Sequence, residues 1–189
     1  MSSIATFDFL TVHKDKTPIS FLFTWHIARE HYVTARVCLQ QSPIGIAHSG
    51  CLLAQQCVEM FVKAILTLDH RSTDIHYLQK LLARGKGIPY FSELLTNPKL
   101  SYFIENLNLV HAKMRFGEAG FGVKQQELIQ VLDEVAFNLN KTYLNMMKCK
   151  DAHPFYVPDA LKESFLHDNK FFRDNDISNN VMDSIPQPT

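Results

Sequence analysis

Hydrophobic residues recur at intervals of three and four positions through residues 46–68, which is the spacing of one face of an α-helix. A second apolar line runs beside the first, so polar side chains keep only a narrow stripe. The first line is Ala47, Cys51, Ala54, Val58, Phe61, Ile65 and Leu68; the second is Leu53, Cys57, Met60 and Ala64; the stripe is Ser49, Gln56, Glu59 and Lys63. We expect a helix that is apolar on two sides to lie at the centre of its domain or to be partly buried by another chain.

Several further segments have helical periodicity, and no segment shows a rival strand pattern. The first expected helix runs from about residue 24 to the Ser42-Pro43 break, with Arg29, Glu30 and Arg36 facing water. A short helix is expected within residues 75–85, where Asp74 can cap it, and a helical turn within residues 89–96. A further helix starts at Pro98 with Asn97 as its cap, and the last covers about residues 124–148. The short links predict an all-α protein, an antiparallel up-and-down helical bundle.

Composition divides the chain into an N-terminal arm (residues 1–21), the bundle (residues 22–148) and a partly loose C-terminal extension (residues 149–189). Pro154 and Pro158 break the helical pattern where the extension begins. Four residues of the extension are too apolar for a simple spacer, and we expect them to dock on the bundle or on a partner: Leu161, Phe165, Phe171 and Phe172.

Charge and cysteine usage narrow the class of protein. The chain has 19 basic and 19 acidic side chains, so it lacks the global positive charge of many nucleic-acid binders, although a local basic patch stays compatible with this balance. The four cysteines lack the spacing of a metal site and lie mostly in apolar helical patterns, which fits a reducing cytoplasm. We find no secretory leader and no apolar run of the ~18–20 residues that a membrane span needs. We therefore expect a cytoplasmic protein without a membrane anchor.

The residues by themselves indicate little chemistry. Nine histidines are present, but no His-Glu-x-x-His motif or cysteine pair completes a metal set, so we expect no metal and no cofactor. The GEAGFG stretch at residues 117–122 has the glycines of a phosphate loop, yet it lacks the lysine and follows a helix. No serine has the flanking glycines of a nucleophile elbow, and Cys57 has apolar neighbours that disfavour a thiolate.

Three motifs, in order over residues 22–148, resemble those of HEPN domains (higher eukaryotes and prokaryotes nucleotide-binding). In the central helix the matching residues are Ala54-Gln55-Gln56, Val58-Glu59 and Lys63-Ala64-Ile65. The segment DIHYLQKLL is similar to the family's His-Asp-Leu segment, with His76 in place and Tyr77 where the family has an acid. The segment LNLVHAKMRF is similar to the family's Leu-Asn, aromatic and Arg-Tyr segment, with Leu107-Asn108, His111 where tyrosine is common, and Arg115-Phe116.

The resemblance implies a HEPN-like bundle and a site for RNA or a nucleotide, and the two-sided apolar helix predicts a homodimer. Many members of the family are metal-independent RNA endonucleases that pair Arg-x4-6-His motifs across a dimer, where arginine stabilises phosphate charge and histidine transfers protons. Here Arg115 is followed by no histidine at the matching place, which disfavours nuclease activity. Arg71 and His76 do form an Arg-x4-His pattern, but before the third helix.

The leading hypothesis is therefore a non-catalytic or degenerate HEPN-like module that binds a nucleotide, RNA or a protein partner. The polar residues expected around its groove are Gln56, Glu59, Lys63, His76, His111 and Arg115, with Arg115 holding a phosphate or pairing with an acid. The first alternative is a toxin-type RNA endonuclease that uses Arg71 and His76 and is paired with a nucleotidyltransferase-type antitoxin. The second alternative is a structural assembly protein. A homodimer is expected in each case.

Overall fold

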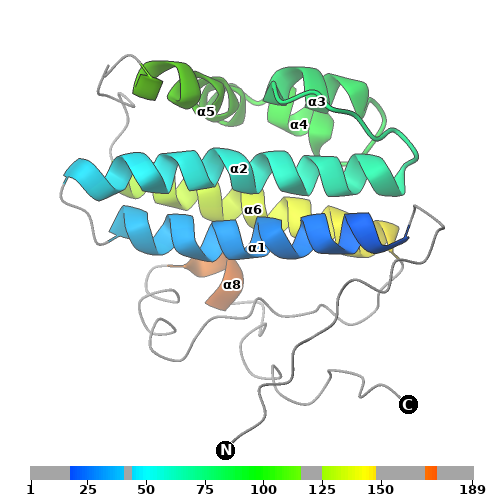
Figure 1. The fold of residues 1–189 in the computed structure, drawn as a ribbon, viewed down its shortest axis with the longest axis horizontal. Coiled ribbons are helices and arrows are strands. Elements are labelled where there is room, and N and C mark those ends of the chain that lie inside the picture. The colour runs from blue at the N-terminus through cyan, green and yellow to red at the C-terminus, as the bar shows by residue number, and fades with distance from the viewer. Residues whose placement is uncertain (1–17, 41–43, 116–124, 148–168, 174–189) are drawn as a thin grey trace, which may run out of the picture.

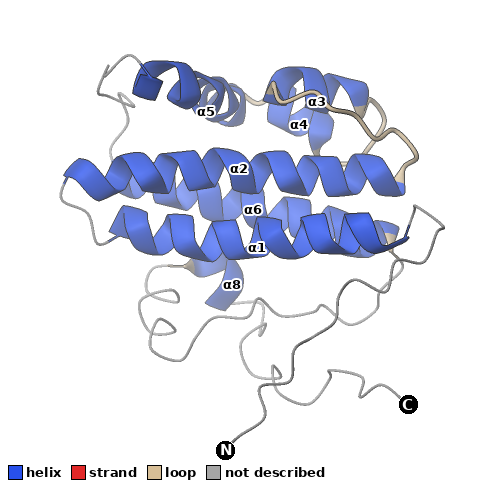
Figure 2. Cartoon of the chain, in the orientation of Figure 1, coloured by secondary structure: helices blue, strands red, loops and turns tan. Residues whose placement is uncertain are grey.

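The computed structural model describes residues 18–40, 44–115, 125–147 and 169–173; within these ranges, the side chains of residues 18–21, 44–48, 110–115 and 173 lie outside the described part. The helices are α1 (Pro18–Gln40), α2 (Ile44–Leu68), α3 (Leu78–Arg84), α4 (Phe91–Thr96), α5 (Pro98–Arg115), α6 (Gln125–Met146) and α8 (Lys170–Arg173). No strand occurs in the described ranges (Figure 2), and the predicted all-α class is confirmed there.

Helix α2 lies in the middle of the molecule (Figure 1). It contacts α1 and α6 on one side and α3 and α5 on the other. The four long helices α1, α2, α5 and α6 alternate in direction along the chain, so that each connection reverses the path (Figure 1). This arrangement is what short links between amphipathic helices favour.

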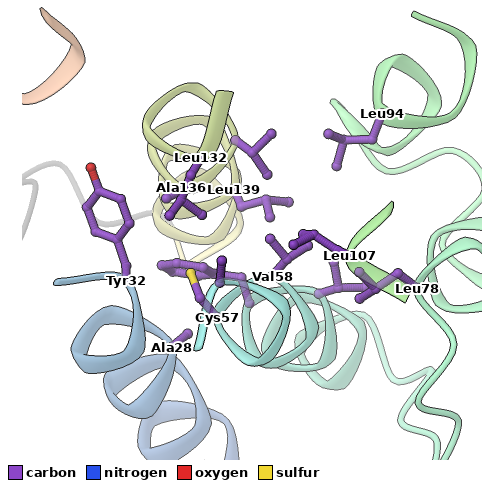
Figure 3. Close-up of a cluster of buried hydrophobic side chains, with 14 of the residues drawn as sticks. Ala28, Tyr32, Cys57, Val58, Leu78, Leu94, Leu107, Leu132, Ala136 and Leu139 are labelled. Atoms are coloured by element: carbon purple, nitrogen blue, oxygen red, sulfur yellow. The ribbon is translucent and has the colours of Figure 1, made fainter. Parts of the chain in front are cut away.

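Both apolar lines of α2 are used in this position. Along the helix, Ala54, Cys57, Val58, Phe61, Ala64 and Ile65 have no exposed surface. Figure 3 shows Val58 between Leu139 of α6 and Leu107 of α5, with Cys57 turned toward Ala136. The prediction that this helix lies at the centre of its domain is confirmed, because packing partners occupy opposite sides of it.

The expectation that no apolar run is long enough for a membrane span is wrong. The stretch Ser49–Leu68 is long and apolar enough to cross a membrane, judged by length and composition alone. More than half of this stretch is buried against the rest of the described chain. A helix that packs on two sides needs apolar residues on both, so its central place in the bundle accounts for this composition.

Helix α1 differs from its prediction in two ways. It begins at Pro18, a few residues before the expected start near Thr24, and proline suits the first turn of a helix. Arg29 and Arg36, which were expected to face water, are both buried. The Arg29 guanidinium lies 4.5 Å from the centre of the Trp25 ring, and burial lowers its pKa to about 10. Arg36 is paired with an acid of α6, described below, and such pairing is what allows a charge to be buried.

Of the two predicted helix caps, Asn97 is confirmed and Asp74 is wrong. Asn97 caps α5 as predicted, since its Oδ1 accepts the backbone N–H groups of Lys99 at 3.0 Å and Leu100 at 3.4 Å. Asp74 does not begin α3, which starts only at Leu78. The N–H of Leu78 donates instead to Oδ1 of Asn108 on α5, at 2.8 Å. A side chain 30 residues away thus supplies the acceptor expected of a local cap.

Helix α8 is held against α6 and α1 by aromatic rings. The Phe172 ring centre lies 5.1 Å from that of Tyr32 and 5.5 Å from that of Phe137, and Phe171 lies 5.8 Å from Phe137. Phe171 and Phe172 therefore dock on the bundle, which is one of the two outcomes expected of them. Leu161 and Phe165 lie outside the described residues.

Candidate functional site

A buried carboxylate on α2 contacts the side chains of a lysine and a histidine at the protein surface. Oε1 of Glu59 lies 2.9 Å from Nζ of Lys63 and 2.8 Å from Nδ1 of His76, while Oε2 accepts a 2.8 Å hydrogen bond from Nε2 of Gln55. The side chain of Glu59 is 6% exposed, that of Lys63 17% and that of His76 77%. We call Gln55, Glu59, Lys63 and His76 the Glu59 cluster. It joins a buried acid to two groups that solvent can reach.

The spacing of α2 and the path of residues 73–77 produce this cluster together. Gln55, Glu59 and Lys63 are four residues apart, so they stand on one edge of the helix. His76 comes from the extended segment before α3, where the N–H of Ile75 donates to Oγ1 of Thr73 at 3.3 Å. The cap by Asn108 then fastens the end of this segment to α5. Residues from two parts of the chain thus meet at one surface, and a third part, α5, fixes the end of the segment that carries His76.

The geometry defines which nitrogen of His76 is available to a ligand. A carboxylate oxygen can only accept, so in the contact with Glu59 the Nδ1 atom of His76 is the donor. This leaves Nε2 of the exposed ring to accept a hydrogen bond or to exchange a proton. Lys63 approaches the same Nδ1 to 3.4 Å, and its ammonium group has three donors, of which Glu59 uses one. The cluster can therefore donate to an anionic oxygen and can take part in proton transfer.

The structure brings together three of the six predicted ligand-binding residues, namely Glu59, Lys63 and His76. Gln56 was expected at the groove, but the buried Gln55 is the amide that contacts Glu59. Both glutamines belong to the same motif, and only the packing of α2 distinguishes them. His111 and Arg115 are in the last turns of α5, and their side chains lie outside the described residues.

Arg71 and His76, the alternative catalytic pair, have different environments. Arg71 forms an ion pair with Asp69, and its Nη1 donates to the carbonyl oxygens of Arg84 at 2.8 Å and Lys86 at 3.1 Å. These carbonyls are at the C-terminal end of α3, whereas His76 lies two residues before Leu78, at which the helix begins. Seven residues of helix span roughly 10 Å. Arg71 therefore stabilises the C-terminal end of α3. These hydrogen bonds hold its side chain there and not at the Glu59 cluster.

A second polar cluster is buried inside the bundle. Asp133 of α6 accepts hydrogen bonds from Nε of Arg36 (2.9 and 3.1 Å) and from the hydroxyl of Tyr32 (2.7 Å). Asn169, just before α8, donates to the Tyr32 oxygen at 3.0 Å. The side chains of Arg36 and Asp133 are 0% and 2% exposed. We call these four residues the Asp133 cluster; it ties α1, α6 and the C-terminal segment to one another.

Burial dominates the electrostatics of the Asp133 cluster. It raises the pKa of Asp133 to about 6, although Arg36 and the Tyr32 hydroxyl favour the charged form. It also raises the pKa of the Tyr32 hydroxyl well above its ordinary value, and the negative charge of Asp133 adds to that effect. Sequence patterns did not predict this cluster. The available signal was the position of Asp133 within the apolar face formed by Leu132, Val135 and Ala136, where an acid needs a buried partner.

A small cavity of about 180 Å³ opens beside Asp133 and is lined by residues of α5, α6 and α8. Its walls are formed by Lys99, Gln130, Asp133, Glu134, Lys170 and Phe171. Two acids and two lysines balance its charge, and Lys99 lies 3.9 Å from Glu134. The lining therefore selects no ligand by charge.

Metal and thiol chemistry find no support in the described ranges. No group of three potential metal ligands occurs among the described His, Cys, Asp and Glu residues. Burial raises the pKa of the Cys57 thiol well above its ordinary value and that of Cys51 to about 11. A thiol that keeps its proton is a poor nucleophile, so these two cysteines serve as core residues.

Comparison with known proteins adds no relative. No family model matches the chain, and no curated protein and no solved structure shows significant similarity to it. The Glu59 cluster is the candidate site on physical grounds: among the described residues it combines a buried carboxylate with a lysine and a histidine that solvent reaches.

Proposed function

We propose that this protein is a non-catalytic, HEPN-like helical module that binds a phosphate-bearing ligand, a nucleotide or RNA, at the Glu59 cluster. The observation that carries the proposal is the carboxylate of Glu59, which contacts both Lys63 and His76 while it is itself almost fully buried. Gln55 orients that carboxylate from the other side. Lys63 and His76 are thus held in place before a ligand arrives, which lowers the entropy lost on binding.

Phosphate is the group that this arrangement suits. Its oxygens accept hydrogen bonds, and Lys63 retains donors beyond the one given to Glu59. His76 adds a largely exposed ring at the same carboxylate oxygen. Arg115 belongs to α5, two helical turns beyond Asn108, and Asn108 fastens α5 to the segment that carries His76. The proposal includes Arg115 as a further phosphate ligand, and it places the protein in the cytoplasm as a homodimer.

Binding of a nucleoside 5′-monophosphate and of a short RNA, measured by fluorescence anisotropy and calorimetry, tests this function. Lys63→Gln removes one charged donor to the phosphate, and we expect it to weaken binding roughly 10- to 150-fold, since a hydrogen bond to a charged group contributes roughly 1.5–3 kcal/mol. Arg115→Ala should also weaken binding. Lys141→Gln, at an exposed position of α6, is the matched control. Equal affinities for the Lys63→Gln and Lys141→Gln variants would exclude the Glu59 cluster as the binding site.

A second candidate, a metal-independent RNA endonuclease of toxin type with a nucleotidyltransferase-type antitoxin as partner, has one supporting observation. The 2.8 Å contact between Glu59 and Nδ1 of His76 is how acids orient a histidine that transfers protons at Nε2. The bonds of Arg71 to the end of α3 weigh against Arg71 as its phosphate ligand. RNA cleavage in excess chelator that is abolished in His76→Ala would favour the enzyme; RNA that stays intact but bound favours the module. A stable dimer that binds neither ligand would favour an assembly protein.

A further inference from the structure

The short helix α3 has one apolar face and one face that carries positive charge and an aromatic ring. Leu78, Leu81 and Leu82 are buried against the bundle. Lys80 and Arg84 are exposed, one turn apart, on the opposite side. Tyr77, which precedes the helix, is 48% exposed although it is a large aromatic residue. We call Tyr77, Lys80 and Arg84 the outer face of α3.

Positive charge is concentrated in this part of a chain that is neutral as a whole. Residues 69–86 have four basic and two acidic side chains, whereas the chain has 19 of each. One of those two acids, Asp69, is paired with Arg71. Lys80, Arg84 and Lys86 are therefore opposed by Asp74 alone within the segment. An anionic partner is favoured at this surface.

The Tyr77 ring distinguishes between kinds of anionic partner. Nζ of Lys80 lies 5.8 Å from the centre of the ring, so a cation and an aromatic surface are presented together. Proteins that bind single-stranded nucleic acids combine these two features: bases stack on exposed aromatic rings, and basic side chains follow the phosphates. An acidic protein needs only the charges, and a duplex has no free base to stack.

The outer face of α3 also follows the Glu59 cluster directly in the chain. His76 and Tyr77 are neighbours in the chain, and the N–H of Leu78, the next residue, is fixed by Asn108. The side chains of Gln79 and Asn108 are hydrogen-bonded as well. The start of α3 thus has a defined position beside the cluster, and a ligand that extends past His76 meets Tyr77 first.

We infer that the outer face of α3 binds a single-stranded nucleic acid, with one base stacked on Tyr77 and the adjacent backbone phosphates at Lys80 and Arg84. This inference rests on the proposed function, which assigns a phosphate to Lys63 and His76. It adds that the ligand is an oligonucleotide rather than a mononucleotide, and it names the residues that distinguish the two.

The test measures the affinity of the full chain for a labelled single-stranded 12-mer, as RNA and as DNA, and for a nucleoside 5′-monophosphate. Tyr77→Ala should weaken oligonucleotide binding roughly 5- to 150-fold, which is the range found for one stacked base. Tyr77→Phe should retain it, because the ring is kept. Phe23→Ala is the control, since Phe23 is an exposed aromatic residue of α1.

The charges are tested through the salt dependence of the same reaction. The double variant Lys80→Gln with Arg84→Gln should lower the slope of log affinity against log salt by about 0.7 for each phosphate that the protein no longer neutralises. Lys141→Gln should leave the slope unchanged. Since Nε of Arg84 also donates to the carbonyl of Arg71 at 3.1 Å, the single variant Lys80→Gln provides a second measurement that spares this bond.

Three results would overturn the inference. Tyr77→Ala could bind the oligonucleotide as well as Phe23→Ala does, a blunt duplex could bind as tightly as the single strand, or poly-glutamate could compete as well as unlabelled oligonucleotide. If Lys63→Gln still weakened mononucleotide binding as expected above, the proposed function would stand without its extension. If neither ligand bound the unmodified protein, both would fail.

Discussion

The Glu59 cluster and the Asp133 cluster are built alike but differ in their access to water. Each has a carboxylate on a central helix that contacts a basic side chain and a residue distant in the sequence. In the Asp133 cluster, Arg36 and Asp133 are almost entirely shielded from solvent. In the Glu59 cluster the acid and Gln55 are shielded, whereas Lys63 is partly exposed and His76 is largely exposed. The Asp133 cluster therefore holds parts of the fold together, whereas the similar groups of the Glu59 cluster are available to a ligand.

The difference in access to water determines how much stability is lost when a residue of each cluster is replaced. A charge that is deprived of its partner inside the bundle cannot be hydrated, so the cost of removing one residue is high. A charge at the surface turns to water when its partner is removed, and much of the stabilisation is recovered. The two clusters should consequently respond very differently to the same kind of substitution.

Arg36→Met should have the largest effect, because it leaves Asp133 buried without its cation. We expect the free energy of unfolding to fall by about 3–5 kcal/mol, measured by urea denaturation followed by circular dichroism. The double variant Arg36→Met with Asp133→Leu is the control, since it removes both charges and should be the more stable of the two. A decrease below about 1 kcal/mol in the single variant would show that the cluster is more hydrated than its burial implies.

The protonation of Asp133 should make stability depend on pH. Its pKa of about 6 in the folded chain lies above the ordinary value of 3.8, and the main cause is burial. The folded state thus holds the proton more tightly than the unfolded state. The stability that this group contributes is complete below pH 4, falls as pH rises through about 6, and amounts to about 3 kcal/mol in total.

Carbon-13 NMR of the Asp133 carboxyl group measures this pKa directly. Urea unfolding at pH 4.5 and pH 7.5 gives the difference in the free energy of unfolding between the two pH values. In Asp133→Asn, the part of this difference that comes from protonation of Asp133 should disappear. A carboxyl group that titrates near pH 4 would instead mean that Arg36 and Tyr32 outweigh the effect of burial.

Glu59→Gln should destabilise the protein less than Arg36→Met does. The amide retains the shape of the carboxylate but not the charge that attracts Lys63 and His76. We expect a decrease in the free energy of unfolding of roughly 1–2 kcal/mol, since both partners reach water. Phosphate binding should weaken as well, because Lys63 and His76 are no longer held in place. A decrease as large as that of Arg36→Met would remove the contrast between the clusters.

Asn108→Ala should have the smallest effect on stability, about 1 kcal/mol, as for the removal of a helix cap. The N–H of Leu78 is then without its acceptor, so its hydrogen exchange should become faster, which NMR measures residue by residue. Oligonucleotide affinity should fall with it if the start of α3 positions Tyr77. The control is Asn106→Ala on the same helix, since the Asn106 amide bonds to the carbonyl of Tyr102, at 2.8 Å, within α5 itself.

Sequence patterns predicted well where one segment determines the outcome. The two apolar lines of α2 implied a central helix, and Asn97 before Pro98 implied a capped start. Sequence patterns failed where the hydrogen-bond or ion-pair partner of a residue comes from a distant part of the chain. Arg36 reads as a solvent-facing residue of an amphipathic helix until Asp133 is known to lie opposite, and Asp74 reads as a cap until Asn108 is seen to supply one.

In the candidate site, too, local spacing predicted some contacts, and others depend on distant parts of the chain. Lys63 and Glu59 could be paired from their spacing of four residues, which holds in any helix. His76 was placed near them only through a family resemblance, and its contact with Glu59 depends on the path of residues 73–77 between two helices. Gln55 and Gln56 are chemically identical in the sequence, so only packing could show which of them is buried beside Glu59.

The sequence alone determined that this protein is helical, that residues 46–68 form its central element, and where most helices begin and end, because backbone preferences and apolar periodicity act over a few neighbouring residues. The tertiary structure decided which charges are buried and which remain open to a ligand. Burial and ion pairing depend on side chains that are about 100 residues apart for Arg36 and Asp133, and local sequence contains no record of such distances.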